Sequence, residues 1–573
     1  MSQTAQICKL FGGFALLTLF QANILQGQTA PNRYWVQFNG KESSELVAGH
    51  STPYSLNSPE YFLSERSIQR RERQSISITA HDLPIAPTYV EAIAEIEELD
   101  VILKSKWFNA VTVRVRDTTF DVESLLELPM VSAVKSVLQT GSKRPPVIEA
   151  MNEPQARMGM DNASTYGQGW EPLAQLNGQW LHGMGFRGEG MWIAILDAGF
   201  EHADHLPIFQ RMRDEGRMRI GLDAMNSQDE LFAHHKHGTS VLGTIAGSLE
   251  DSLIGTAPEG TYWLYRTEDA YSEFLIEEDY WVVAAEHADS LGVDLINTSL
   301  GYSQFDDSTM NHVYDDLDGF TTRISLATSW AAEKGILCVT SAGNRGSSPW
   351  HFITAPADAN GILTVGAVNS AGEHAAFSGW GPTADGRVKP DVMALGVEAA
   401  YPFADGSIRR GNGTSFSSPI LCGAAACLWQ AFPETTAQEL RSAIIASAHL
   451  ADTPNDSMGF GIPDMRNAFK ILDKAGAGQW EENPADNDLL LFPNPSPGGT
   501  ARWIYSGTEA PDAWRILNSR GQLMAEGHLP EWTTPSGHHQ GWVSNTPQRA
   551  GVYLFQLING GRVLRTRTWI LNQ

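Results

Sequence analysis

The amino-acid sequence predicts an α/β protein whose main domain is built on a doubly wound, mostly parallel β-sheet. Residues 191–196 are apolar without alternation, which is typical of a strand buried on both faces. Four similar runs follow, and segments with helical periodicity lie between them. Polar residues flanked by glycine or another small residue come directly after several of these runs. Strand-like and helix-like segments that alternate in this way are typical of a doubly wound parallel sheet.

The elements of this main domain are expected between residues 151 and 475. After residues 191–196, the strand candidates are residues 262–265, 295–297, 336–339 and 363–365. Helical periodicity is found in residues 240–246, 280–290 and 324–334.

A region with a different order of elements precedes the main domain. The candidates are a strand at 34–38, a helix at 88–96, one or two strands at 101–115, a helix at 122–128 and a strand at 131–138. This order predicts a small α+β domain over residues 31–142. Residues 141–146 then resemble a linker. The dibasic pair Lys143-Arg144 within it is either a processing point or an ordinary solvated charge pair.

The N-terminus has the pattern of an export signal. Lys9 is the one charged residue before the apolar core at residues 10–20. This core is too short for a permanent transmembrane helix, so we expect residues 1–27 to be a cleaved signal peptide. The alternative is an N-terminal membrane anchor. No later stretch is long and apolar enough to predict a membrane span.

Composition narrows the class of protein further. The chain has 573 residues, too many for one core, so we expect three or four domains. The 40 basic and 66 acidic residues give a formal charge of −26, which argues against nucleic acid and anionic membranes as partners. Cys8 leaves with the signal peptide, and we expect Cys338, Cys422 and Cys427 to be buried thiols rather than a disulfide framework.

The C-terminal region, residues 486–573, is rich in short strands and turns. Residues 515–523 predict a hairpin, and a second hairpin is predicted around the turn at 559–561. This pattern predicts a small β-sandwich.

Ser415 stands at the start of a run without charges, from residue 413 to residue 432. Such a run predicts a helix that is buried nearly all round. The N–H groups and positive dipole end of a helix N-terminus suit an oxyanion. A serine at this position is usually only a helix cap, so a catalytic interpretation requires partner residues elsewhere.

Three further polar residues supply these partners. Asp197 ends the strand candidate that begins at residue 191, His237 begins a helix candidate, and Asn344 follows a strand candidate. A nucleophilic hydroxyl needs an imidazole to accept its proton and a carboxylate to orient that imidazole. An amide can bind the oxyanion. We therefore expect Ser415, His237, Asp197 and Asn344 to meet at the carboxyl edge of the sheet.

The motifs around these residues resemble those of the subtilisin-family (subtilase, S8) serine proteases, in the order Asp, His, Ser. They are Asp197-Ala198-Gly199, His237-Gly238-Thr239, Ile254 to Pro258, Ser299-Leu300-Gly301, Ala342-Gly343-Asn344, Phe377 to Pro382 with Lys389 to Asp391, and Gly413 to Pro419. The resemblance implies a secreted serine endopeptidase that acts through an acyl-enzyme. The family often has Ser or Thr where Ala198 stands, at a position to which no role is assigned.

The same resemblance implies that Ser299, Leu300 and Gly301 form a strand edge that pairs with extended peptide and protein substrates. The alternative is a plain buried strand end.

The two flanking regions also resemble known domains. By position and element order, residues 31–142 resemble the inhibitory propeptide and folding chaperone of many subtilases. Residues 486–573 resemble the sorting domain of the type IX secretion system. That second resemblance depends on Phe492 to Asn494 with Pro495, Leu517 to Gly521, Gly551 to Tyr553, and a last strand with Arg562, Arg565 and Arg567. It implies export through the periplasm by this machinery to the medium or the cell surface. The alternative is a carbohydrate-binding or protein-binding β module.

Metal binding offers two further interpretations. His202, His205, His234 and His235, with His237, could form a metal cluster, but no fixed set of Cys or carboxylate ligands accompanies them. We therefore expect no catalytic metal, and no cofactor required for the chemistry.

The acidic residues at 305–307 and 315–319 could hold a calcium ion or form a solvated acidic loop. The family resemblance leaves structural calcium open without a match to particular residues. A second functional class, a non-catalytic surface adhesin on a protease scaffold, would be favoured by a missing triad member, and none is missing.

Overall fold

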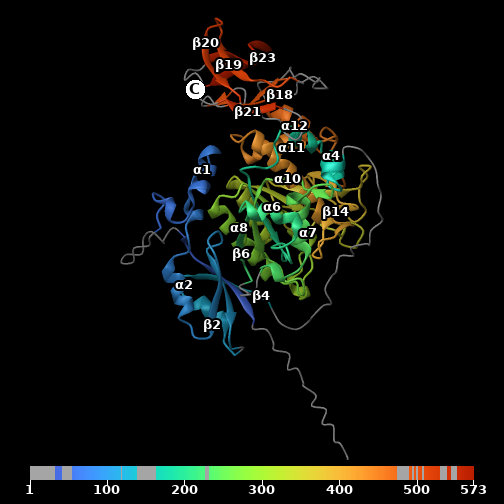
Figure 1. Ribbon diagram of the computed structural model, residues 1–573. Coiled ribbons are helices and arrows are strands. Elements are labelled where there is room, and N and C mark those ends of the chain that lie inside the picture. Colours follow the sequence, from blue (N-terminus) through green and yellow to red (C-terminus); the bar gives the residue numbers. More distant parts are fainter. Residues whose placement is uncertain are drawn as a thin grey trace, which may run out of the picture.

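The computed structural model describes residues 32–41, 54–117, 119–138, 163–225, 231–473, 489–492, 496–497, 501–505, 509–529, 539–543 and 551–572 (Figure 1). The predicted signal peptide and the dibasic pair Lys143-Arg144 lie outside these residues. Within them, the chain forms an N-terminal α+β region, a central α/β domain and a C-terminal all-β region. None of the helices in the described residues has the length and apolar character needed to span a bilayer.

Seven strands form the sheet of the central domain, in the order β13-β12-β11-β10-β5-β9-β6. They are β5 (Trp192–Asp197), β6 (Met218–Asp223), β9 (Thr261–Arg266), β10 (Leu295–Thr298), β11 (Leu337–Ser341), β12 (Leu363–Val368) and β13 (Val392–Leu395). Each neighbouring pair is parallel, which confirms the predicted parallel sheet. The chain winds from β5 to one edge, returns, and then winds from β10 to the other edge. The winding reverses between β5 and β10, where α/β sheets commonly bind ligands.

Helices cover both faces of this sheet. Helices α7 (His237–Ala246) and α10 (Thr414–Ala431) pack on the face that Ile193 and Ile195 of β5 present. Helices α8 (Ile276–Leu291) and α9 (Arg323–Glu333) pack on the other face. Because side chains alternate along a strand, β5 is buried on both sides, as its uninterrupted apolar sequence predicts.

Shorter elements complete the central domain. The helices are α3 (Ala163–Tyr166), α4 (Trp170–Gln175), α5 (Gly178–Gly183), α6 (Gln210–Asp214), α11 (Ala437–Ala446) and α12 (Met465–Leu472). The strands are β7 (Ser248–Leu249), β8 (Leu253–Ile254), β14 (Ala399–Pro402) and β15 (Ile408–Gly411). Cys338, Cys422 and Cys427 are buried and form no disulfide, as predicted.

The N-terminal region is an antiparallel sheet of four strands in the order β2-β3-β1-β4, with two helices. The elements are β1 (Arg33–Phe38), α1 (Glu65–Arg73), α2 (Pro87–Ala94), β2 (Leu99–Ser105), β3 (Ala110–Val115) and β4 (Val131–Leu138). The helix expected at 122–128 is a 3-10 helix at Val122–Glu127. The arginine-rich residues of α1 gave no sequence prediction, yet they form a helix that the side chain of Ser64 caps.

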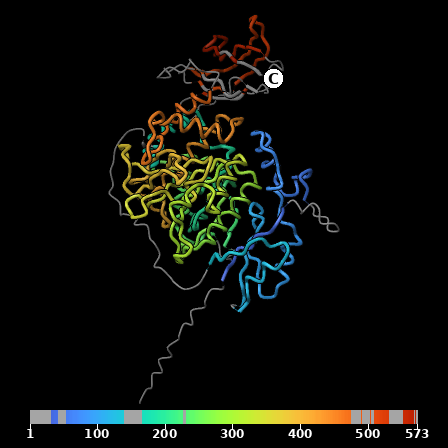
Figure 2. Tube along the Cα trace, turned by 180° about the vertical axis from the view of Figure 1, so that it is seen from behind, coloured from blue at the N-terminus to red at the C-terminus, as the bar shows by residue number. Residues whose placement is uncertain are grey.

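This N-terminal region lies against one flank of the central domain in both views of the chain (Figures 1 and 2). The turn between β2 and β3 contacts helix α8. Glu286 of α8 accepts hydrogen bonds from the backbone N–H groups of Lys106 and Trp107, at 2.8 and 3.0 Å, and from the hydroxyl of Ser105 at 2.6 Å. A carboxylate on one helix therefore binds the whole turn of the neighbouring sheet.

The described part of the C-terminal region contains two sheets. One has the order β16-β18-β21, with β16 (Leu489–Phe492), β18 (Ala501–Tyr505) and β21 (His539–Val543). The other has the order β17-β23-β22-β19-β20, with β17 (Ser496–Pro497), β19 (Ala513–Asn518), β20 (Leu523–His528), β22 (Gly551–Asn559) and β23 (Arg562–Asn572). One apolar cluster contains Trp503 from the first sheet and Phe555 and Trp569 from the second.

Candidate active site

The carboxyl edge of the central sheet holds Asp197, Ser299 and the segment that leads to Asn344. Asp197 ends β5, and the parallel register pairs the preceding Leu196 with Thr298 of β10. Thr298 is paired in turn with Thr340 of β11. The residues that follow these strands, Ser299 and the segment that leads to Asn344, therefore leave the sheet at the same edge as Asp197.

Asp197 and His237 form a hydrogen-bonded pair. The Oδ1 atom of Asp197 lies 2.8 Å from Nδ1 of His237, and the Asp197 carboxyl group is fully buried. The same oxygen accepts the N–H of Ala198 at 2.8 Å. With Nδ1–H donated to a carboxylate, the imidazole is held in the tautomer whose Nε2 accepts a proton. The side chain of His237 keeps 16% of its surface exposed, so a substrate can reach it.

Gly238 allows the start of helix α7 to approach Asp197 closely. A Cβ atom at position 238 would lie 2.4 Å from the carbonyl oxygen of Gly199 and 3.0 Å from Cβ of Asp197. Any larger residue would therefore move the helix, and with it His237, away from the carboxylate.

Ser415 lies in the first turn of α10 and keeps 5% of its surface exposed. Its hydroxyl donates to the carbonyl oxygen of Ser299 at 3.2 Å, and the hydroxyl of Ser299 donates to the carbonyl of Ser415 at 3.0 Å. In this arrangement the hydroxyl hydrogen of Ser415 points toward the carbonyl oxygen of Ser299. Transfer of this proton to an imidazole requires the O–H bond to turn away from Ser299, and catalytic hydrogen bonds often tighten only when substrate is bound.

Asn344 is held against the N-terminus of α10. Its Oδ1 atom accepts the backbone N–H of Thr414 at 2.8 Å and the Thr414 hydroxyl at 2.9 Å. These two bonds orient the amide so that its NH₂ group faces away from Thr414, beside Gly413. The side-chain amide of Asn344 is thus positioned by Thr414, to which the sequence analysis assigned no role.

A buried polar network lies beneath Ser415, and the sequence analysis did not predict it. Ser418 donates to Oδ1 of Asn297 at 2.8 Å, and Nδ2 of Asn297 donates to the hydroxyl of Ser299 at 3.1 Å. Ser299 then contacts the backbone of Ser415. The sequence signal was weak, because Asn297 is followed by another polar residue, Thr298, and Ser418 is one of several small polar residues at the start of the run from residue 413.

The segment Ser299-Leu300-Gly301 continues from β10 along the edge of this site. Leu300 is half-buried and Gly301 is exposed. Tyr302, directly after them, forms an antiparallel bridge with Ala355. An exposed backbone in this position is able to pair with an extended peptide.

The histidines considered as an alternative metal cluster are not among the side chains that the described residues place at metal-ligand spacing. His202 contacts the carbonyl oxygen of Ala404 through Nδ1 at 2.8 Å, and its ring lies 4.8 Å from that of His205. His235 lies nearly parallel to His237, with ring centroids 6.4 Å apart. Burial, and then the neighbouring His237, lower the pKa of His235.

The acidic stretches at 305–307 and 315–319 mostly cap turns. Asp307 accepts the N–H and the hydroxyl of Thr309, at 2.9 and 2.7 Å. Asp318 accepts the N–H groups of Phe320 and Thr321, each at 2.8 Å. These bonds stabilise the turns of the two segments.

A different acidic group lies near Asp197. Within the described residues, Glu268, Glu273 and Glu277 have carboxylate oxygens within 4.8 Å of one another, the spacing of a metal-ligand set. Burial raises the pKa of Glu268 and of Glu277 well above the ordinary value, and the neighbouring carboxylates add to this effect. The hydroxyl of Tyr302 donates to Glu268. Sequence analysis gave no prediction for these three residues.

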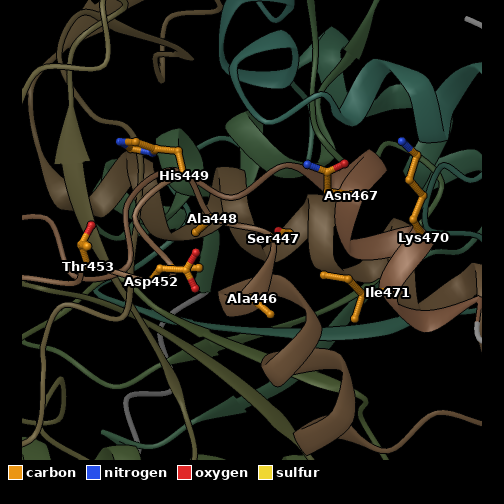
Figure 3. A pocket seen from close by; sticks show the side chains of 10 residues that line it. Ala446, Ser447, Ala448, His449, Asp452, Thr453, Asn467, Lys470 and Ile471 are labelled. Carbon is orange, nitrogen blue, oxygen red and sulfur yellow. The ribbon is translucent and has the colours of Figure 1, made fainter. Parts of the chain in front are cut away.

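A separate cavity of about 680 Å³ lies between the end of α11 and α12 (Figure 3). Ser447, His449, Asp452, Asn467 and Lys470 are among its lining residues. It contains none of the predicted site residues, so the candidate active site remains the carboxyl edge of the sheet.

Comparisons with known proteins bear on the same segment. Residues 188–462 match the profile of the subtilase family, Peptidase_S8. Residues 33–150 match the profile described as the Peptidase S8 propeptide domain of Bacteroidota. These two matches cover the central domain and the N-terminal region, respectively.

Individual relatives align with the central domain. The chain is 28% identical to subtilisin of Bacillus pumilus over 281 residues, which are 48% of this chain and 90% of that protein. It is 27% identical to subtilisin E of Bacillus subtilis (strain 168) over 281 residues, 48% of this chain and 65% of that protein. The crystal structure of MycP1 from Mycobacterium smegmatis superposes with a TM-score of 0.43 and 22% identity, over 60% of this chain and 90% of that chain.

Proposed function

We propose that this chain, which is a subtilisin-like serine peptidase, hydrolyses peptide bonds with the triad Ser415, His237 and Asp197. Ser415 Oγ attacks the scissile carbonyl carbon and gives its proton to Nε2 of His237. Asp197 holds the imidazole in the required tautomer and stabilises the imidazolium that forms. His237 then returns the proton to the leaving amine, which leaves an acyl-enzyme that water hydrolyses by the same steps.

The oxyanion that forms during attack is stabilised by two donors. These are the side-chain amide of Asn344 and the backbone N–H of Ser415 at the N-terminus of α10. The bonds between Thr414 and Asn344 support this assignment, because they hold the amide in one orientation before the reaction begins. A preorganised donor costs no reorganisation when charge develops.

Substrate lies in an extended conformation along Ser299, Leu300 and Gly301. Main-chain pairing would hold many sequences, because it uses groups that every residue carries. Such pairing suits an endopeptidase that acts on unfolded or flexible protein segments.

The observation that carries this proposal is the 2.8 Å contact between the fully buried Asp197 and the part-exposed His237. A buried carboxylate that orients a reachable imidazole is the arrangement that serine peptidases need. The Ser415 hydroxyl, at the start of a buried helix, supplies the nucleophile.

A fluorophosphonate probe tests the proposal, since it phosphonylates only an activated serine. The processed enzyme should be labelled on the peptide that contains Ser415, and Ser415→Ala should abolish labelling. Ser417→Ala, on the same helix, is the matched control and should label normally. Labelling that survives Ser415→Ala would reject Ser415 as the nucleophile.

The chain divides into four segments, each with a proposed role in export, inhibition or catalysis. Residues 1–27 act as a signal peptide, residues 31–142 as the propeptide, residues 151–475 as the catalytic domain and residues 486–573 as a type IX sorting domain. The enzyme would then pass through the periplasm and be released or held at the cell surface. Mass spectrometry of the mature termini tests this order, and retention of both terminal regions in the exported enzyme would contradict it.

The proposed chemistry requires no cofactor. A serine, an imidazole, a carboxylate and an amide supply every group that peptide hydrolysis needs. A structural calcium ion is a separate matter and would appear as a lower melting temperature in a chelator, with the initial rate unchanged.

A further inference from the structure

Helix α1 of the N-terminal region binds the carboxyl end of helix α8. The hydroxyl of Ser67 donates to the carbonyl oxygen of Asp289 at 2.7 Å, and Nε of Arg66 donates to that of Gly292 at 2.9 Å. Carbonyl groups in the last turn of a helix have no partner within the helix and carry the negative end of its dipole. The side chains of α1 therefore add donors to this helix end, where the N–H of Gly292 also bonds to the carbonyl oxygen of Asp289.

The same helix also reaches the carboxyl end of α9. Nε2 of Gln74, directly after α1, donates to the carbonyl oxygen of Gly335 at 2.8 Å. Arg70 bridges the two helix ends, because Nη1 donates to Val293 at 2.5 Å and Nε donates to Lys334 at 3.3 Å. One short basic helix thus caps two helices of the catalytic domain.

Asp289 forms the centre of this contact. Nη2 of Arg70 lies 2.6 Å from its Oδ1 atom, and Nη2 of Arg71 lies 2.9 Å from its Oδ2 atom. All three side chains are at most 1% exposed. Burial alone would raise the pKa of Asp289, but Arg71, Lys106 and Arg70 hold it well below the ordinary value. The carboxylate is therefore charged, and Arg70, Arg71 and Lys106 of the N-terminal region form ion pairs with it.

Without α1, this arrangement would be unfavourable. Asp289 lies in the last turn of α8, where the helix dipole favours cations and disfavours a carboxylate. Asp294, just after the same helix, pairs with Arg66 of α1. The catalytic domain thus concentrates two carboxylates and two sets of helix-end carbonyls in one place, which suits the binding of guanidinium groups.

Two glycines show how closely the surfaces fit. Gly292 ends α8 with φ of +88°, and a Cβ atom there would lie 2.5 Å from the backbone nitrogen of Ser67. Gly335 follows α9 with φ of +83°, and a Cβ atom there would lie 2.6 Å from Nε2 of Gln74. Both helices therefore end in left-handed glycines that leave room for α1.

This contact is remote from the catalytic residues. Asp294 immediately precedes β10 and lies at the amino edge of the sheet, whereas Ser299 follows the same strand at the carboxyl edge. The four residues of β10 separate the two edges by about 13 Å. Substrate at the carboxyl edge would not need to displace α1.

We infer that the catalytic domain carries a second binding site for its own pro-region, which we name the arginine socket. It consists of Asp289, Asp294 and the carboxyl ends of α8 and α9. Asp289 binds the guanidinium groups of Arg70 and Arg71, and Asp294 binds that of Arg66. The socket retains the pro-region after the chain between the two domains has been cut, so that cleavage alone does not free the active site. This inference rests on the proposed role of the N-terminal region as a propeptide.

The test uses the full chain with Ser415→Ala, so that the outcome does not depend on turnover. A recognition sequence for a site-specific protease is inserted after Gly141, and the chain is cut with that protease. Gel filtration and a dilution series then measure how much pro-region stays bound. We expect co-elution in the parent chain and at least a tenfold weaker association in the variant Arg70→Gln with Arg71→Gln.

The matched control removes two other arginines of the same region. Arg114 and Arg116 both pair with Asp100 at exposed positions within the N-terminal sheet. Arg114→Gln with Arg116→Gln changes the net charge equally and should leave association within twofold of the parent. Equal retention in the two double variants would overturn the inference.

Asp289→Asn provides a second variant from the catalytic side, for the case in which the arginine variant fails to fold. It keeps the shape of the side chain and removes its charge, and thermal unfolding of the uncut chain reports on its fold. We expect the same tenfold loss, and retention at the parent level would also overturn the inference. Failure of the proposed catalytic function would instead appear as absent probe labelling of the Ser415 enzyme, independently of these binding data.

Discussion

Replacement of Thr414 by valine tests how Asn344, the proposed oxyanion donor, is oriented. It weakens the support of the Asn344 amide and leaves the amide itself in place. The side chains have nearly the same shape, so the change removes one hydroxyl and leaves helix α10 in place. The lost bond is the 2.9 Å contact from the Thr414 hydroxyl to Oδ1 of Asn344. The backbone N–H of Thr414 still donates to the same oxygen at 2.8 Å.

The expected loss of kcat in Thr414→Val depends on the hydrogen bond that remains between the Thr414 backbone and Asn344. A neutral hydrogen bond contributes about 1 kcal/mol net, which corresponds to roughly a fivefold change in rate. Since the backbone bond persists, we expect kcat of Thr414→Val to fall about twofold to fivefold. Asn344→Ala removes the donor completely, and loss of such a donor costs about 2.7–4 kcal/mol, or roughly a hundredfold to a thousandfold.

The assay is steady-state hydrolysis of a chromogenic peptide by the processed enzyme. KM should change little in both variants, because the amide acts on charge that develops only in the transition state. The double variant tests the coupling between the two residues. If Thr414 acts through Asn344, then Thr414→Val should have no further effect once Asn344 is alanine.

Two results would refute this reasoning. A full additional loss in the double variant would mean that the Thr414 hydroxyl acts at another point of the reaction. Wild-type turnover in Asn344→Ala would remove Asn344 from the oxyanion site altogether. Ser417→Ala serves as the control for general disturbance of α10.

Two further predictions concern packing and pH. Gly238→Ala should lower kcat and destabilise the domain by about 1–3 kcal/mol, because the new methyl group meets the carbonyl of Gly199; unchanged melting and turnover would contradict this. Burial, with a smaller contribution from Arg187, lowers the pKa of His182 to about 3. The folded state therefore excludes a proton that the unfolded chain binds below about pH 6.5, and stability should fall by roughly 2–3 kcal/mol from pH 7 to pH 4.5. Urea unfolding at both pH values should show a flatter dependence for His182→Gln, and an equal slope would refute the assignment.

The parallel sheet could be predicted because it depends on local sequence. An uninterrupted apolar run such as residues 191–196 specifies a strand buried on both faces wherever it pairs. Polar residues that follow such strands are then brought to one edge by the parallel topology itself. The positions of Asp197, Ser299 and Asn344 follow from this rule and from the register of three neighbouring strands.

The supporting residues could not be predicted in the same way. Asn297 and Ser418 are 121 positions apart in the chain, and only the packing of α10 on β10 brings them into contact. The contacts of helix α1 could not be predicted either, because a run of arginines normally indicates a solvated surface. Their partners are helix-end carbonyls and Asp289, which no periodicity in α1 reveals. The 3-10 helix at Val122–Glu127 is too short for periodicity to separate it from an α-helix.

The two edges of the central sheet thus have different proposed roles, and β10 connects them. The carboxyl edge holds Ser299 beside the nucleophile, and the amino edge holds Asp294 within the arginine socket. If the pro-region also occupied the carboxyl edge, each contact would keep the other at a high effective concentration, and joint retention would exceed either contact alone. Activation would then require that both contacts open together or that the pro-region be degraded.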